Sequence, residues 1–175
     1  TVIRVADGAK ATISLDTGEI QSGEGDLDEN CGIRLTNVDN IIIEGFTIEG
    51  GTCGIYYEST RDRGRKPLEN ISTKNCDSSG IVGVHGLCVY ASNDNAAIKN
   101  LTVDGCEISD CKCGDSESLV MNGNIDGFTI SNNIIHNNNN SGIDMVGFEG
   151  TARHTGGHKS ADPFEVDFAR NGRCF

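Results

Sequence analysis

The sequence predicts an all-β solenoid in which short parallel strands stack coil upon coil along one axis. Three observations predict it: apolar and polar residues alternate at a period of two, similar segments begin 30, 30 and 27 residues apart, and Gly and Asn punctuate the ends of the expected strands. In no window does the spacing of an amphipathic helix persist for more than one turn, and Gly and Asn occur too often for helices. We therefore expect a chain built essentially of strands.

The repeat rests on four segments that align without gaps. They are Asn40-IIIEGFTIEGG, Asn70-ISTKNCDSSG, Asn100-LTVDGCEISD and Gly127-FTISNNIIHNN. One coil cannot bury its own apolar side, so equivalent positions should stack into ladders. Asn at positions 40, 70 and 100 suits stacked turns, because Asn tolerates left-handed backbone and hydrogen-bonds its own turn. Cys76 should lie over Cys106 in an inward stack of small side chains.

A further strand interleaves with this repeat. Its segments are Cys31-GIRLTN, Cys53-GIYYES, Leu87-CVYASN, Glu117-SLVMNG and Ser141-GIDMVG, each with an aliphatic residue at the third place. Alternation at a period of two places the even-numbered residues on the outward face. This predicts two outward ladders, one of Arg34, Tyr56, Tyr90, Val120 and Asp144, and one of Thr36, Glu58, Ser92, Asn122 and Val146.

These motifs, G-I-x-L followed by N-I-x-I-x-G/N-x-x-I, resemble the right-handed parallel β-helix family, the pectate-lyase-like superfamily, over about residues 31–150. The resemblance implies a right-handed single-stranded parallel β-helix of about five to six coils. We expect residues 1–30 to form an opening coil and loop, residues 31–147 the coils, and residues 148–175 a long loop leading to a missing or capping coil. A solenoid needs a cap, so we expect either a fragment of a longer protein or self-association through an uncapped C-terminal coil.

The net charge of the chain limits the kinds of partner that we expect it to bind. The net charge is −12 and the sequence pI is about 4.6, with no basic run. Nucleic-acid and anionic membrane surfaces need clustered Lys and Arg, so we expect neither partner. No stretch reaches the roughly 18 apolar residues that span a bilayer. With the resemblance, these features favour a secreted or cell-surface location.

The eight cysteines leave two interpretations open. In the first, several are small buried hydrophobic residues in a reducing or anaerobic setting. In the second, Cys106, Cys111 and Cys113 form a metal or redox cluster, although their spacing matches no paired zinc motif.

The resemblance also implies a chemistry, the β-elimination of uronate-containing polysaccharides. In such lyases an Arg or Lys abstracts the proton α to the uronate carboxylate while calcium neutralises that acid. The candidate bases are Arg153 and Lys159, and the candidate calcium ligands are Asp110, Asp115, Glu117 and Asp144. Hydrolysis by paired carboxylates, such as Glu58 and Asp144, is the second choice of reaction.

The outward ladders predict a polysaccharide-binding strip. Tyrosine rings can cover the apolar face of a sugar while polar neighbours bond its hydroxyls. The strip would comprise Tyr56, Glu58, Tyr90, Asn122 and Asp144. The alternative for these side chains is ordinary stacking between coils. The alternative for the whole protein is a non-catalytic carbohydrate-binding or adhesin-like surface module.

Overall fold

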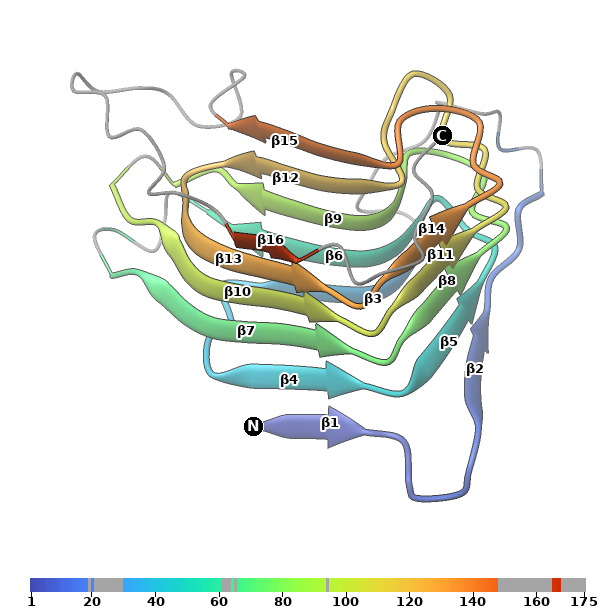
Figure 1. Cartoon of the computed structure of the whole chain (residues 1–175), viewed down its shortest axis with the longest axis horizontal. Helices are drawn as coiled ribbons and strands as arrows, with labels where there is room; N and C mark the ends of the chain where they lie inside the picture. Colours follow the sequence, from blue (N-terminus) through green and yellow to red (C-terminus); the bar gives the residue numbers. More distant parts are fainter. Residues whose placement is uncertain are drawn as a thin grey trace.

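Three parallel sheets run the length of the solenoid in the computed structural model (Figure 1). The structure describes residues 1–18, 20, 30–60, 64, 66–93, 95–147 and 165–167. Every pairing between neighbouring strands of these sheets is parallel. The predicted fold class, an all-β parallel β-helix, is confirmed.

Each complete coil contributes one strand to each sheet. Sheet A consists of β1 (Val2–Arg4), β4 (Ile41–Glu44), β7 (Leu68–Lys74), β10 (Ile98–Asp104), β13 (Ile125–Ser131) and β16 (Glu165–Asp167). Sheet B consists of β2 (Ala11–Ser14), β5 (Phe46–Glu49), β8 (Asp77–Ser79), β11 (Glu107–Ser109) and β14 (Ile134–His136). Sheet C consists of β3 (Cys31–Thr36), β6 (Cys53–Ser59), β9 (His85–Ala91), β12 (Leu119–Gly123) and β15 (Ile143–Gly147).

The core is a set of ladders inside the three sheets. Ile41 is level with Ile71, Ile71 with Leu101, and Leu101 with Phe128, as the sequence alignment predicts. Cys76 and Cys106 are 2% and 3% exposed and belong to the same core, which confirms their inward stack. Burial of such apolar side chains stabilises the fold by about 25 cal/mol for each Å² removed from water.

Asparagines in left-handed backbone stack along sheet A, just before β4 and within β7 and β10. Asn40, Asn70 and Asn100 have φ of 53°, 58° and 54°. Asn70 Nδ2 donates to Asn40 Oδ1 at 2.9 Å, and Asn100 Nδ2 donates to Asn70 Oδ1 at 3.3 Å. The predicted Asn stack is therefore an amide ladder that links three successive coils.

Other asparagine side chains form hydrogen bonds with the backbone of the preceding coil. In the last described coil, the Oδ1 atoms of Asn138 and Asn139 accept hydrogen bonds from the backbone N–H groups of Cys111 and Cys113, at 2.9 and 2.7 Å. Asn138 Nδ2 also donates to the carbonyl of Ile108 at 3.2 Å. Amide side chains thus replace backbone partners at this corner, which gives the Asn137–Asn140 run a structural role.

The predicted register of sheet C is wrong by two residues in the third coil. The structure pairs Cys53 with His85 and Ile55 with Leu87, whereas the sequence alignment placed Leu87 level with Cys53. Gly54 and Gly86 explain the difference. A Cβ on Gly54 would lie 2.3 Å from the carbonyl oxygen of Gly86, and a Cβ on Gly86 would lie 2.4 Å from Ile108 Cγ2. Because only glycine fits this approach of neighbouring coils, Gly86 takes the place equivalent to Gly54.

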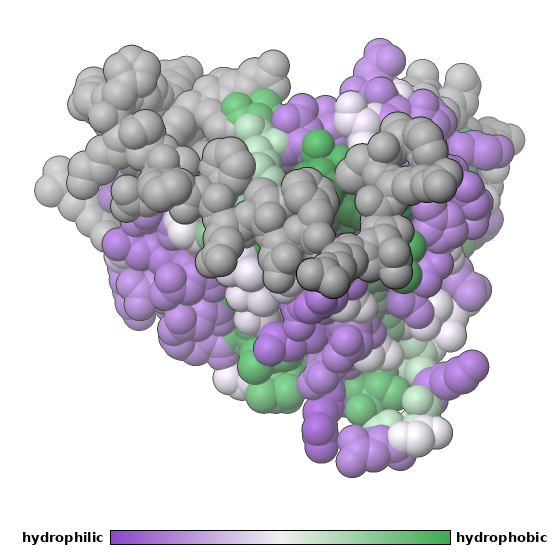
Figure 2. All heavy atoms as spheres, viewed as in Figure 1, coloured by the Kyte–Doolittle hydropathy of each residue, from purple (hydrophilic) through white to green (hydrophobic). Residues whose placement is uncertain are grey.

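The described surface is mostly hydrophilic in the view of Figure 2, with apolar atoms showing near its lower end, where β1 lies. Val2 and Ile3 of β1 are 55% and 46% exposed. Among the described strands, none pairs with the outer edge of β1. The predicted loop at 148–175 lies outside the described residues except for β16, which pairs with β13.

Candidate functional site

Side chains that could bind a ligand or react are concentrated in a cluster at sheet C. Cys53, Tyr56, Cys88 and Val120 form a buried cluster separate from the main core, and Cys31, Tyr90 and Val146 pack at its border. We call these seven residues the sheet C cluster. Cys53 and Cys88 are 0% exposed and Tyr56 is 3% exposed. Three cysteines from three successive coils therefore belong to one cluster.

Cys31 and Cys53 form a thiol pair at the start of their strands. They are level with each other in the pairing of β3 with β6. Each sulfur lies near a backbone carbonyl oxygen, Cys31 Sγ at 3.4 Å from that of Ile33 and Cys53 Sγ at 3.7 Å from that of Ile55. Both are free thiols. The neighbouring Cys53 side chain lowers the pKa of Cys31, while burial raises the pKa of Cys53 well above its usual range. Cys31 is the thiol of the pair that ionises more readily.

His85 is level with Cys53 in the pairing of β6 with β9. Cys31, Cys53 and His85 therefore form a row across three neighbouring strands. Its Nδ1 lies 2.8 Å from the carbonyl oxygen of Glu117. A carbonyl oxygen only accepts, so we assign the ring hydrogen to Nδ1 and a free lone pair to Nε2. Burial lowers the pKa of His85 and favours the neutral ring. Tyr90 Oη lies 3.5 Å from Nε2.

An ion pair and two rings border the thiols. Arg34 bridges to Glu58 with 3.2 Å between Nη2 and Oε2, and its guanidinium carbon lies 5.6 Å from the centre of the Tyr56 ring. The rings of Tyr56 and Tyr90 meet edge to face, with centres 5.7 Å apart and planes at 88°. Such contacts fix the orientation of both rings.

The predicted sugar-binding strip is only partly assembled. Tyr56 and Tyr90 do not share a ladder: Tyr56 is level with Cys88, while Tyr90 is level with Glu58 and Asn122. The two-residue shift of the third coil is the cause. Tyr56 and Asn122 are 3% and 8% exposed, so their side chains do not form an open surface. Asp144 is exposed on β15, level with Val120.

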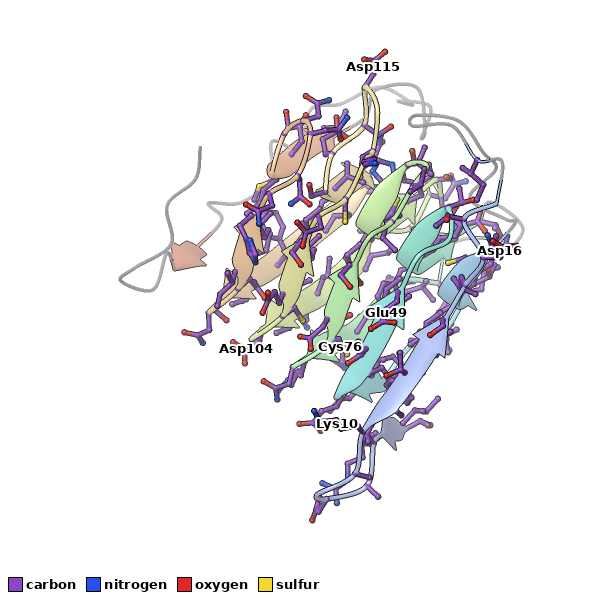
Figure 3. The ribbon with its side chains drawn as sticks, turned by 90° about the vertical axis from the view of Figure 1, so that its right-hand side faces the viewer. Lys10, Asp16, Glu49, Cys76, Asp104 and Asp115 are labelled. Carbon is purple, nitrogen blue, oxygen red and sulfur yellow. The ribbon has the colours of Figure 1, made fainter. Side chains whose placement is uncertain are left out.

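The four predicted calcium ligands do not form a ligand set. Within the described part of the chain, no group of three or more His, Cys, Asp or Glu side chains is placed to hold a metal ion. Asp110 occupies a left-handed corner after β11, and Asp115 stands on the loop that follows (Figure 3). Glu117 Oε2 lies 3.9 Å from His85 Nδ1. The candidate bases Arg153 and Lys159 lie outside the described residues.

The alternative cluster of Cys106, Cys111 and Cys113 is divided between two environments. The neighbouring Cys113 side chain lowers the pKa of Cys111, whose Sγ lies 3.3 Å from the carbonyl oxygen of Ser109. Cys106 Sγ instead lies 3.7 Å from the carbonyl oxygen of Thr73 and 3.6 Å from that of Asp104. The three thiols therefore do not act as one group in this structure.

The row of Cys31, Cys53 and His85 was missed at the level of sequence. A signal for it exists: each of the three is followed by Gly and then by Ile or Leu. Aligning these three-residue motifs instead of the aliphatic positions alone would have placed a histidine beside the two cysteines.

Comparison with known proteins adds a family. A profile of the family described as "Periplasmic copper-binding protein (NosD)" matches residues 12–149. A segment of 39 residues is 64% identical to "Uncharacterized protein YwoF" of Bacillus subtilis (strain 168), covering 22% of this chain and 8% of that protein. No solved structure matches. No helix among the described residues is long and apolar enough to cross a membrane.

Proposed function

Because the chain belongs to the NosD family, described as a periplasmic copper-binding protein, we propose that it binds Cu(I) through the paired thiols of Cys31 and Cys53. One observation carries the proposal: two free thiols from neighbouring coils are level with each other in adjacent parallel strands.

The donor set fits copper in its reduced state. Thiolates are soft ligands that favour Cu(I), and a d¹⁰ cation accepts two sulfur ligands. A structural zinc ion takes four ligands, and no group of three or more suitable side chains occurs among the described residues. The neutral His85 ring stands next in the row, with its Nδ1 held by a carbonyl in the manner of many metal-ligating histidines.

The surrounding residues would protect such an ion. Cys31 is half-buried, whereas Cys53 is fully buried, so an ion can reach the pair from the side of Cys31. Tyr56, Cys88 and Val120 pack around the inner thiol and limit its contact with water. The periplasmic description of the family also supports our proposal that the protein acts outside the cytoplasm, as a secreted or envelope protein.

Titration of the reduced protein with Cu(I), in competition with a chromogenic Cu(I) chelator, tests this function. We expect one tightly bound ion per chain. Cys31→Ser and Cys53→Ser should each weaken binding by on the order of 100-fold, because each removes one of two ligands. Cys76→Ala is the matched control, since Cys76 also stacks on a cysteine of the next coil, but both members of that stack are buried. Unchanged affinity in Cys53→Ser would refute the proposal.

A second candidate function is binding of a polysaccharide, with or without β-elimination. Glu58, Tyr90 and Asn122 lie level with one another on three neighbouring strands, and this arrangement favours the candidate. The half-buried ring of Tyr90 lies beside the half-buried carboxylate of Glu58, and a ring with a polar neighbour can bind a sugar. The parallel β-helix fold supports the same proposal, although fold alone does not assign an activity.

Incubation with pectate and alginate distinguishes the forms of this second candidate. A lyase releases unsaturated uronate ends, which absorb in the ultraviolet. A binding module retains the polymer without product. In either case Tyr90→Ala should reduce retention of the polymer by about fivefold, since a stacked ring contributes on the order of 1 kcal/mol. Neither product nor retention would eliminate the candidate.

A further inference from the structure

We propose that Cys31 and Cys53 close reversibly to a disulfide that joins β3 to β6. The two residues are level in a parallel pair, and neighbouring strands lie about 4.8 Å apart. Disulfides bridge Cα atoms separated by about 4.4–6.8 Å. Because the spacing of paired strands already falls in this range, closure requires rotation of side chains and little displacement of the coils.

The other cysteine pairs in the described part of the chain lack one requirement or another. Cys76 and Cys106 stack in the core, but they are only 2% and 3% exposed. Cys111 and Cys113 are both 1% exposed. Among these pairs, Cys31 and Cys53 alone combine level positions on neighbouring strands with a half-buried member, Cys31, that a reagent can reach.

The oxidation is a two-step exchange with a small-molecule disulfide such as oxidised glutathione. The Cys31 thiolate attacks one sulfur of the reagent, a mixed disulfide forms, and one thiolate leaves. Cys53 then loses its proton and attacks the Cys31 sulfur, and the second thiolate leaves. The two cysteines are oxidised by two electrons, the reagent is reduced to two thiols, and the two protons of the protein thiols end on them. Cys31 is suited to the first attack because it is half-buried, whereas Cys53 is fully buried.

Closure of the disulfide should prevent copper binding, an expectation that rests on the proposed function. A disulfide removes both thiolate ligands, so the oxidised chain should not bind Cu(I). The same bond ties the first coil to the second. The outer edge of the first coil is unpaired among the described strands, so the bond secures a coil with a neighbour on one side only.

Disulfide mapping tests the inference on the full 175-residue chain. The reduced protein is equilibrated with mixtures of oxidised and reduced glutathione, remaining thiols are alkylated, and peptides are identified by mass spectrometry. We expect a Cys31–Cys53 linkage that forms at lower oxidant concentration than any other and opens with dithiothreitol. Cys76→Ala should leave it unchanged. A Cys31 that stays alkylatable throughout, or that pairs first with another cysteine, would overturn the inference.

The two proposals fail in different ways. Cu(I) titration is repeated on the oxidised chain after the linkage has been mapped. If the linkage forms but the reduced chain binds no Cu(I), the disulfide stands and the copper function fails. If the reduced chain binds Cu(I) and no linkage forms, the copper function stands and the disulfide fails.

Discussion

Gly54→Ala should lower the free energy of unfolding by about 3 kcal/mol, at the upper end of what overpacking costs in a dense interior. The added Cβ would lie 2.3 Å from the carbonyl oxygen of Gly86 and 2.6 Å from Ser78 Oγ. The first of these atoms is backbone of the next coil, so relief requires the coils themselves to move. Denaturant unfolding of the two proteins measures the difference.

Gly142→Ala is the matched control for this prediction. Gly142 occupies the equivalent place in the last complete coil, because Leu119 is level with Ile143 there. Its Cβ would meet Ile135 Cγ2 at 3.5 Å, an ordinary contact. We expect a change within about 0.5 kcal/mol. Equal losses in both variants would show that close approach of the coils is not what requires Gly54.

Asn70→Ala should lower the free energy of unfolding by about 2 kcal/mol. Alanine in left-handed backbone costs about 1–2 kcal/mol, and the substitution also removes two hydrogen bonds of the amide ladder. Asn70→Gly separates the two effects, since glycine keeps the backbone conformation and loses only the exposed hydrogen bonds. The same unfolding experiment should give a loss within about 1 kcal/mol for glycine.

A result in which both Asn70 variants lose equally would assign the whole effect to the ladder. The next coil provides a natural precedent for the glycine variant. Gly127, with φ of 78°, follows Asp126 at the position equivalent to Asn100, and lies beside the Asn100 side chain. The four described coils that contain this position therefore all have left-handed backbone there, but only three of them have an amide side chain.

The sequence was sufficient for sheets A and B because their coils contain no insertions between equivalent positions. Ile48, Ser78, Ile108 and Ile135 follow their leading residues at one fixed spacing and are level in the structure. The loop that precedes sheet C varies in length from coil to coil. A shift of two residues keeps every side chain on its predicted face, so alternation alone could not detect the error at Leu87.

The candidate site was harder to predict because it forms between coils. Cys31 and Cys53 are 22 positions apart, and nothing local to either indicates a partner. Only the correct register between neighbouring strands shows that Cys31, Cys53 and His85 lie side by side. The same two-residue error in register affected the expected sugar-binding strip, because it placed Tyr90 level with Tyr56, where the structure has Cys88. The lyase prediction depends on Arg153 and Lys159, outside the described residues, and stays a prediction.

The most direct test of the central claim is X-ray absorption at the copper edge of the Cu(I)-loaded, reduced protein. A thiol-pair site predicts Cu(I) with two sulfur neighbours in the wild type. It also predicts the loss of both in the Cys31→Ser, Cys53→Ser double variant, with the Cys76→Ala spectrum unchanged. Copper coordinated by nitrogen and oxygen alone, or a sulfur signal that survives in the double variant, would contradict the assignment of Cys31 and Cys53 as the copper ligands.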